Sequence, residues 1–299
     1  MDSRSDAPLV LLTGARGFTG AYMKQELADA GLRVIGTTMH APAAADELVM
    51  DVASSDDCRR VIESIRPDYI VHLAAISFVQ HPDPVDFYRA NVVGTSNLLQ
   101  ACTDVGHVPT KILLASSGHV YGSVKEAVFR EDDPLNPMNH YATSKVAMEL
   151  MARNWFERLP ILIARPFNYT GIHQPSQFLV PKIVQHFRDR APVIELGNLD
   201  VARDFSDVRT VVSAYRALLE SPDAGQIVNV CSGSGYALRD IIESLQDIAG
   251  YEIRIEVNPL FVRPNEVRSL IGSTEKLRRL VPGLAPCRFE ETLRWMYTA

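Results

Sequence analysis

The stretch LVLLTGARGFTG, residues 9–20, decides the fold of this chain. It begins as a short apolar run, turns at glycines 14, 17 and 20, and continues into a pattern with helical spacing. A glycine turn between a buried strand and a helix lets the backbone approach a pyrophosphate, and the helix N-terminus offers N–H donors and a positive dipole. The stretch therefore predicts the first strand, turn and helix of a dinucleotide-binding unit.

The rest of the first half repeats this alternation of apolar runs and helical patterns. Short continuous apolar strands between amphipathic helices are typical of a parallel sheet covered on both faces. We therefore predict an α/β protein with a doubly wound parallel sheet of the Rossmann type. The expected strands are 9–13, 33–38, 69–75, 111–116 and 160–166, and the longest expected helices are 84–105 and 140–158.

The pattern loosens after Pro166, where Pro, Gln, His and Asn cluster. We predict a dinucleotide-binding domain over 1–166 and a smaller lobe over 167–299, laid over the carboxyl ends of the strands. The run IVNVCSG, 227–233, looks like a strand that returns to the main sheet, so the two parts should be interleaved.

Composition narrows the class of protein. The 299 residues are 46% hydrophobic and 22% charged, with a net charge of −6, which gives no electrostatic footprint for nucleic acid or an anionic membrane. The first apolar run is too short for a signal sequence or a spanning helix, so a cytoplasmic protein is expected. The four cysteines are scattered without metal-ligand spacing, so neither a metal site nor disulfides are predicted.

The cofactor preference is predicted from the second strand and the glycine turn. Sites that prefer NAD hold the ribose 2′-hydroxyl with an acidic residue at the end of this strand, and here RVIGTTMHA has none. Arg16, inside the turn, could meet a 2′-phosphate, although a solvated loop charge explains it too. NADPH is favoured, with NADH as the alternative. The expected cofactor-binding residues of this part are Gly14, Arg16, Gly17, Phe18, Thr19, Gly20, Thr38, His40, Asp51, Val52, Leu73, Ala74 and Ala75.

Two further segments predict a hydride-transfer site. In HYATSK the residues Tyr141 and Lys145 are four apart, hence on one face of a helix. A phenol is a poor acid–base at neutral pH, and a nearby ammonium should lower its pKa. In LASSGHVYG the hydroxyls of Ser116 and Ser117 follow an apolar strand, where they could reach the same site.

In this order, TGARGFTG, LAA, NVVGTSNLL, SSGHVYG and YATSK resemble an extended short-chain dehydrogenase/reductase over nearly the whole chain. The resemblance implies a catalytic triad of Ser117, Tyr141 and Lys145. It also implies that Asn91 orients the cofactor side or the lysine network. A homodimer through the helices at 84–105 and 140–158 is a further implication, although the apolar positions there are equally explained as core.

The second half is similar to the branch of this family that handles GDP-deoxysugars, in RPFNYTGIHQPSQFLVPKI, ELGNLDVARDFSDVRTVVSAY and NPLFVRPNEVRSLIGSTEKLRRL. The resemblance implies a small-molecule GDP-sugar substrate and a lobe over 167–299 that mainly binds this nucleotide-sugar. Asn168 would bond the sugar diphosphate, Glu266 would accept from a ribose hydroxyl, and three cations would neutralise the pyrophosphate. The expected substrate-binding residues are Ser116, Ser117, Asn168, Lys182, Arg203, Arg263 and Glu266.

The stretch SSGHVYG separates the activities of this branch. Dehydratases of the family place a carboxylate where this chain has His119, and no other acid lies in the stretch. We therefore expect reduction of the C4 ketone of GDP-4-dehydro-6-deoxy-D-mannose to GDP-6-deoxy-D-mannose (GDP-D-rhamnose). A neutral imidazole could still serve a dehydratase as base. His119 and His173 could form the acid–base pair of an epimerase-reductase like GDP-fucose synthase. A nucleotide-sugar-binding protein without catalysis is the non-enzymatic alternative.

Overall fold

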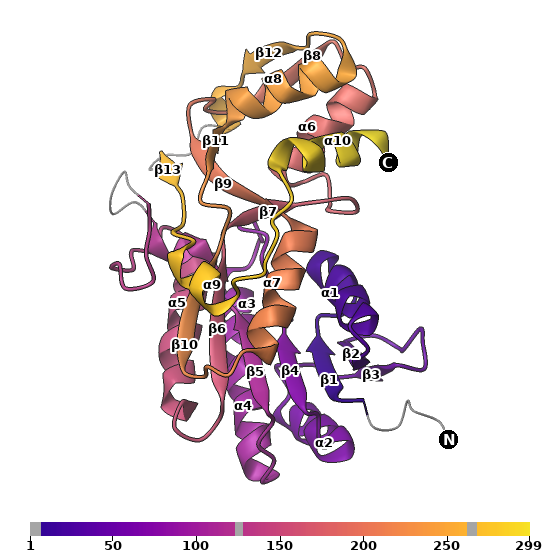
Figure 1. The fold of residues 1–299 in the computed structure, drawn as a ribbon, viewed down its shortest axis with the longest axis vertical. Coiled ribbons are helices and arrows are strands. Elements are labelled where there is room, and N and C mark those ends of the chain that lie inside the picture. The colour runs from indigo at the N-terminus through magenta and orange to yellow at the C-terminus, as the bar shows by residue number, and fades with distance from the viewer. Residues whose placement is uncertain (1–6, 123–127, 262–267) are drawn as a thin grey trace.

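A seven-stranded parallel sheet forms the centre of the protein, as a computed structural model shows (Figure 1). The structure describes residues 7–122, 128–261 and 268–299. The strand order is β10-β6-β5-β4-β1-β2-β3, which confirms the α/β class and the doubly wound parallel sheet. The strands are β1 (Leu9–Thr13), β2 (Arg33–Thr38), β3 (Glu47–Val49), β4 (Tyr69–His72), β5 (Lys111–Ala115), β6 (Ile161–Pro166) and β10 (Gln226–Val230).

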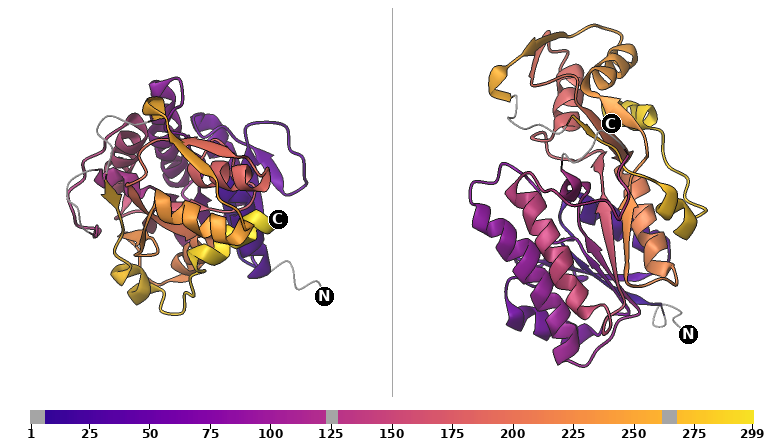
Figure 2. Two further views of the ribbon diagram at one scale, coloured as in Figure 1. Left: turned by 90° about the horizontal axis from the view of Figure 1, so that it is seen from above. Right: turned by 90° about the vertical axis from the view of Figure 1, so that its left-hand side faces the viewer.

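Helices cover both faces of this sheet (Figure 2). On one face lie α1 (Phe18–Asp29) and α7 (Val208–Glu220), whose apolar sides pack against alternate strand residues such as Val10 and Leu12. On the other face lie α2 (Ser55–Ile65), α4 (Gly94–Asp104) and α5 (His140–Ala152), which pack on residues of opposite parity such as Leu11. Because successive strand side chains point to opposite faces, continuous apolar strands bury both.

The helix expected over 84–105 is interrupted. The segment consists of α3 (Pro84–Tyr88), one π-helical turn (Arg89–Val93) and α4. The π turn contains Asn91, which is buried and bonds outside its own helix, to Ile76 and Ser144. A π turn inserts one extra residue per turn and shifts the register of the faces, which apolar periodicity alone does not reveal.

A second lobe lies over the carboxyl ends of the strands, at the top of Figure 1. Its core is formed mainly by α6 (Leu179–Arg188), α8 (Leu238–Ala249) and α10 (Phe289–Thr298). These pack with the strand pair β8 (Val193–Leu196) and β12 (Arg254–Val257). The remaining strands are β7 (Asn168–Thr170), β9 (Ala202–Asp207), β11 (Gly235–Ala237) and β13 (Ser269–Leu270), and the remaining α-helix is α9 (Glu275–Leu280).

The chain crosses between the lobes more than once. After β6 it enters the second lobe at β7, and after α7 it returns to the main sheet, where β10 pairs in parallel with β6. The carboxyl ends of β6 and β10 therefore both lead directly into the second lobe. None of the helices in the described part of the chain has both the length and the apolar character needed to span a bilayer.

Candidate active site

A cavity of about 830 Å³ lies between the two lobes, at the carboxyl ends of β1, β4, β5 and β6. Both lobes contribute to its lining, which is a common location for ligand sites in open α/β sheets. Of the residues predicted from the sequence, the cavity is lined by Gly14, Gly17, Phe18, Thr19, Gly20, Leu73, Ala75, Ser116, Ser117, Tyr141, Lys145, Asn168, Lys182 and Arg203.

The glycine turn needs its glycines for steric reasons. Gly14 has a φ of +70°, and a Cβ there would lie 2.8 Å from the backbone nitrogen of Ala74. A Cβ on Gly20 would overlap the carbonyl oxygen of Gly14. The N-cap of α1 is Gly17, which has no side chain to occupy the first N–H groups of the helix. These donors are therefore available to an anion at the cavity wall.

Arg16 is engaged by a carboxylate that the sequence did not reveal. Its Nε and Nη2 atoms donate to Glu47 at 3.1 and 2.7 Å, and Nη2 also donates to the carbonyl oxygen of Ala41 at 3.0 Å. The hydrogen bond from Arg16 lowers the pKa of Glu47 to about 2. Glu47 comes next to the turn because β3 pairs with β2. A 2′-phosphate would thus meet an ion pair and not an isolated guanidinium.

Several predicted cofactor residues lie outside the cavity lining. Thr38 accepts from the backbone N–H of His40, which is exposed. Asp51 organises its own loop by accepting from the N–H of Ala53, and Val52 is buried against Gly94. The N–H of Ala74 donates to Thr13 at 3.0 Å, which fixes the backbone beside the glycine turn.

Ser117, Tyr141 and Lys145 meet in the cavity. Asn139 caps α5 by accepting from the N–H of Ala142 at 2.9 Å, and this sets the direction in which the first turn presents Tyr141. Tyr141 is hydrogen-bonded with Ser117. Lys145 donates from Nζ to the carbonyl oxygen of Ala115 at 2.7 Å, so α5 is tied to the end of β5.

The electrostatics of this trio differ from expectation. Burial raises the pKa of Tyr141 to about 12, and the hydrogen bond with Ser117 opposes the shift only in part. The ammonium of Lys145 was expected to lower this pKa. Burial also lowers the pKa of Lys145 to about 8, against the attraction of Glu149. Tyr141 therefore keeps its proton at neutral pH, as a proton donor must.

A buried ion pair below the trio was missed by the sequence analysis. Arg165 donates from Nε and Nη2 to the two carboxylate oxygens of Glu149 at 2.9 and 2.6 Å, and both side chains are almost fully buried. Ser116 donates to Glu149 at 2.5 Å, so its proton is directed into the interior. Arg165 also donates to Tyr121, at 2.8 Å. The spacing of Glu149 one turn after Lys145 was the available signal.

Asn91 acts from outside the cavity. Its amide Nδ2 donates to the carbonyl oxygen of Ile76 at 3.2 Å and to Ser144 at 2.9 Å, while its Oδ1 accepts from the N–H of Ile76 at 3.1 Å. Ile76 lines the cavity, and Ser144 lies on α5 next to Lys145. Asn91 thus ties the loop after β4 to the helix that carries the tyrosine and lysine.

The second lobe contributes polar groups to the other side of the cavity. Asn168 has a buried Oδ1 without a hydrogen-bond partner among the described residues. Lys182 donates from Nζ to the carbonyl oxygen of Glu195 at 3.0 Å and lies 4.7 Å from the ring centre of Phe261. Arg203 donates to the carbonyl oxygen of Ala202. Arg263 and Glu266 fall outside the described residues.

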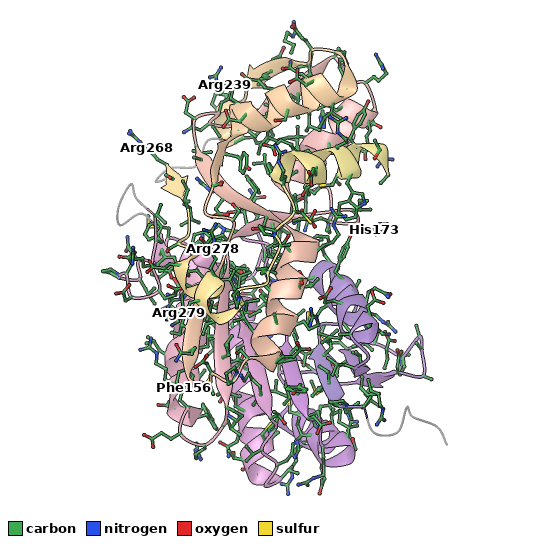
Figure 3. All side chains as sticks on the ribbon, in the orientation of Figure 1. Phe156, His173, Arg239, Arg268, Arg278 and Arg279 are labelled. Atoms are coloured by element: carbon green, nitrogen blue, oxygen red, sulfur yellow. The ribbon has the colours of Figure 1, made fainter. Side chains whose placement is uncertain are left out.

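The two histidines of interest occupy different places. His119 lines the cavity, with its ring 6.2 Å from that of Tyr141 in an edge-on arrangement. His173 is exposed, has a φ of 69° and is not part of the cavity lining. Figure 3 places it at the outer edge of the molecule near α1. The structure therefore does not bring His119 and His173 together in the cavity.

The chain is similar to known proteins over most of its length. A family model described as GDP-mannose 4,6 dehydratase matches residues 11–296. GDP-6-deoxy-D-talose 4-dehydrogenase of Aggregatibacter actinomycetemcomitans is 34% identical over 271 residues, covering 90% of this chain and 89% of the relative. GDP-6-deoxy-D-mannose reductase of Pseudomonas aeruginosa is 36% identical over 281 residues, with the same coverage of each chain.

Two solved structures share the whole fold. A proposed epimerase from Burkholderia cenocepacia J2315 is 45% identical, with a TM-score of 0.91 and coverage of 97% of both chains. RMD from Pseudomonas aeruginosa, complexed with NADPH, is 32% identical, with a TM-score of 0.86 and coverage of 98% of this chain and 97% of that chain. These matches confirm the resemblance to the GDP-deoxysugar branch. Because the family model matches nearly all of the chain and the relatives align over nine-tenths of it, the chain belongs to the GDP-mannose 4,6 dehydratase family.

Proposed function

We propose that this protein reduces the C4 ketone of GDP-4-dehydro-6-deoxy-D-mannose to GDP-6-deoxy-D-mannose. The observation that carries the proposal is the meeting of Tyr141, Ser117 and Lys145 with the glycine turn in one cavity that also receives cations from the second lobe. The relative from Pseudomonas aeruginosa, a GDP-6-deoxy-D-mannose reductase, supports it.

The residues present fit a dinucleotide cofactor. The wall formed by Gly14, Gly17 and Gly20 leaves room for a pyrophosphate against the backbone, and the open N-terminus of α1 provides donors for it. A bound reduced nicotinamide would supply the hydride for C4. NADPH is the favoured form, supported by the NADPH complex of the neighbouring structure, with NADH as the alternative. The ion pair of Arg16 with Glu47 should make the preference for NADPH weaker, because Glu47 competes with a 2′-phosphate for the guanidinium.

The proposed chemistry divides between the side chains of the trio. Tyr141 donates its proton to the oxygen at C4 as negative charge develops there, and its high pKa keeps that proton in place at neutral pH. Ser117 holds the same oxygen through its hydroxyl. Lys145, fixed by the carbonyl oxygen of Ala115, provides positive charge beside the phenol and holds the nicotinamide ribose.

The substrate contacts are proposed for the second lobe. Asn168 has an unpaired buried acceptor at the cavity and would bond a donor of the sugar nucleotide. Lys182 and Arg203 line the same cavity and would neutralise the diphosphate, with Arg263 and Glu266 expected to assist.

We propose that the chain divides into a dinucleotide-binding domain over 1–166, to which β10 returns, and a mainly substrate-binding part over 167–299. A homodimer and a cytoplasmic location stay predictions.

The product at C4 is tested directly. The purified protein is incubated with GDP-4-dehydro-6-deoxy-D-mannose and either NADPH or NADH, and the sugar is identified by NMR. GDP-6-deoxy-D-mannose supports the proposal. The relative from Aggregatibacter acts on the C4 epimer, so GDP-6-deoxy-D-talose would mean hydride delivery to the opposite face. GDP-fucose would indicate an epimerase-reductase, and absence of cofactor oxidation would contradict all three.

A second incubation separates reductase from dehydratase. A dehydratase must remove a proton from C5 and expel the C6 hydroxyl. Dehydratases of the family carry a carboxylate for this step at the position where this chain has His119, whose ring lies beside that of Tyr141. GDP-mannose with NADP⁺ alone should therefore give no product. Formation of the 4-keto sugar would overturn the assignment in favour of a dehydratase that uses an imidazole base.

A further inference from the structure

Tyr215 on α7 contributes a buried hydroxyl to the edge of the cavity. It lies on α7 with 1% of its surface exposed, and its ring belongs to the core between α1, α7 and the sheet. Its hydroxyl oxygen is buried without a hydrogen-bond partner among the described residues. Tyr215 is nevertheless part of the cavity lining. The unpaired group thus lies at the boundary between core and ligand space.

Tyr215 is one of three phenols at this cavity, and the other two are paired. Tyr169 shares a hydrogen bond of 2.8 Å with Thr19 in the first turn of α1, and its ring stacks on Phe18. Tyr141 is bonded with Ser117. Both Tyr169 and Tyr141 are close enough to help raise the pKa of Tyr215, after burial as the main cause. Tyr215 therefore neighbours both the N-terminus of α1 and the proposed hydride-transfer site.

An unpaired buried hydroxyl is a cost to folding. Burial strips the phenol of its bonds to water, and nothing described replaces them. A phenylalanine would fill the same apolar space without that cost. A hydroxyl at this place is therefore explained best by a partner that enters with a ligand.

The position of Tyr215 indicates which part of a bound ligand its hydroxyl would contact. In the proposed function, the pyrophosphate lies at the N-terminus of α1 and the reactive ring lies at Tyr141. The nicotinamide nucleotide half of the cofactor must span the distance between them, and its carboxamide oxygen and ribose hydroxyls are hydrogen-bond acceptors. The sugar nucleotide, by contrast, meets the cations of the second lobe.

We propose that the Tyr215 hydroxyl donates a hydrogen bond to the nicotinamide nucleotide half of the bound dinucleotide, an inference that rests on the proposed function. The hydroxyl oxygen is covered by its neighbours, so the bond requires a small shift of the side chains above it on binding. Tyr215 is then a cofactor-binding residue supplied by α7, a helix in which the sequence analysis placed no site residue.

The test uses Tyr215→Phe, which removes only the hydroxyl. The variant should melt at a higher temperature than the wild type in the absence of ligand, because the unpaired group is gone. Its Kd for NADPH, measured by fluorescence titration, should rise about three- to tenfold, the worth of one hydrogen bond. Its Kd for adenosine 2′,5′-bisphosphate, which lacks the whole nicotinamide nucleotide half, and for GDP should stay unchanged.

Tyr251→Phe is the matched control. Tyr251 lies in the second lobe, away from the glycine turn. Its hydroxyl donates to the carbonyl oxygens of His186 and Phe187, at 3.3 Å each. This variant should melt at a lower temperature, with NADPH affinity unchanged.

Three outcomes would overturn the inference. They are an unchanged NADPH affinity in Tyr215→Phe, an equal loss of affinity for adenosine 2′,5′-bisphosphate, and a loss confined to GDP, which would place the hydroxyl on the sugar nucleotide. If the wild type itself bound neither NADPH nor NADH, the proposed function would fall and the inference with it. If the wild type binds and the variant binds equally well, only the inference fails.

Discussion

Tyr141 is held in a site where burial outweighs every other influence on its acidity. Its pKa of about 12 suits a group that must arrive protonated and lose its proton only when an alkoxide forms beside it. Ser117 and Lys145 fix its place from two other directions, through β5 and through the next turn of α5. At the scale of single residues, this arrangement supports the proposed role of Tyr141 as proton donor.

Replacing Tyr141 by Phe removes the donor while leaving the ring. We expect turnover with the 4-keto sugar to fall about 10²–10⁴-fold, the usual worth of general acid catalysis. The Kd for NADPH should change little, since the ring and Lys145 remain. Steady-state kinetics and a binding titration measure the two quantities. Near-normal turnover in this variant would contradict the assigned role.

Glu47 is expected to weaken the preference for a 2′-phosphate by pairing with Arg16. The substitution Glu47→Gln keeps the shape but removes the charge, so the guanidinium becomes available. Since Arg16 is part-exposed, the ratio of kcat/KM for NADPH over NADH should rise only about two- to fivefold, and less at high salt. An unchanged ratio of kcat/KM for NADPH over NADH would mean that the 2′-phosphate of the cofactor does not lie near Arg16.

At the scale of secondary-structure elements, the main feature is how α5 is joined to the neighbouring strands β5 and β6. The pair of Glu149 with Arg165 joins α5 to β6, and Ser116 joins the same carboxylate to the end of β5. The strand that leads to Ser117, the helix that carries Tyr141 and the strand that leads into the second lobe thus share one buried charge centre. We therefore expect this centre to hold the geometry of the three elements more than it stabilises the fold.

The energetics of this pair can be tested by removing one charge or both. Glu149→Gln leaves the Arg165 guanidinium buried without its counter-charge, and the free energy of unfolding in urea should fall by about 3–5 kcal/mol. The double variant Glu149→Leu with Arg165→Met leaves no unpaired charge and should recover much of that loss. A double variant as unstable as the single one would mean that the pair itself stabilises the fold.

His72 makes the sheet sensitive to acid. Its ring bonds to Thr13 on β1 at 2.7 Å and to Thr95 on α4 at 2.9 Å, and burial lowers its pKa to about 3. Between pH 6.5 and 3 the unfolded chain takes up a proton that the folded one refuses, so stability should fall as pH decreases through this window. His72→Gln should show a shallower fall in urea unfolding between pH 7 and 4. An identical slope would contradict this account.

At the scale of the whole molecule, the two lobes touch across the cavity through aromatic side chains. Phe78 follows β4, and Phe178 precedes α6, with ring centres 5.9 Å apart in an edge-on arrangement. Both line the cavity. This contact joins the first lobe, where the cofactor is proposed to bind, to the second lobe, where the sugar nucleotide is proposed to bind. It should stabilise the relative position of the lobes in which the two ligands lie side by side.

Phe178→Ala removes that contact. An aromatic pair contributes about 0.5–1.5 kcal/mol beyond its buried area, so the KM for the sugar nucleotide should rise about two- to tenfold, with a smaller change in kcat. Phe156→Ala is the control, since Phe156 packs on the core of the first lobe, at the lower left of Figure 3, and is not part of the cavity lining. It should alter stability without altering KM. Equal KM effects in the two variants would argue against a specific role of the contact.

Local patterns predicted the parts of this molecule that depend on neighbours in sequence. The glycine turn and the spacing of Tyr141 and Lys145 lie within single elements, so their geometry follows from strand and helix periodicity. Glu47 was missed because β-pairing brings it to Arg16 from 31 residues away. Tyr215 was missed because a phenol on a helix face looks the same whether its hydroxyl meets core or cavity. The π turn at Asn91 escaped because apolar spacing does not record a register shift.

The return of β10 to the main sheet also governs the order of events during synthesis. Until residues 226–230 leave the ribosome, β6 has an open edge with unpaired N–H and C=O groups, although every other strand of the sheet is already available. The nascent first half is therefore a template for pairing with other chains while the second half is made. A fragment that ends at residue 166 would keep that edge permanently, so expression of the first part alone should give aggregates and not an isolated dinucleotide-binding domain.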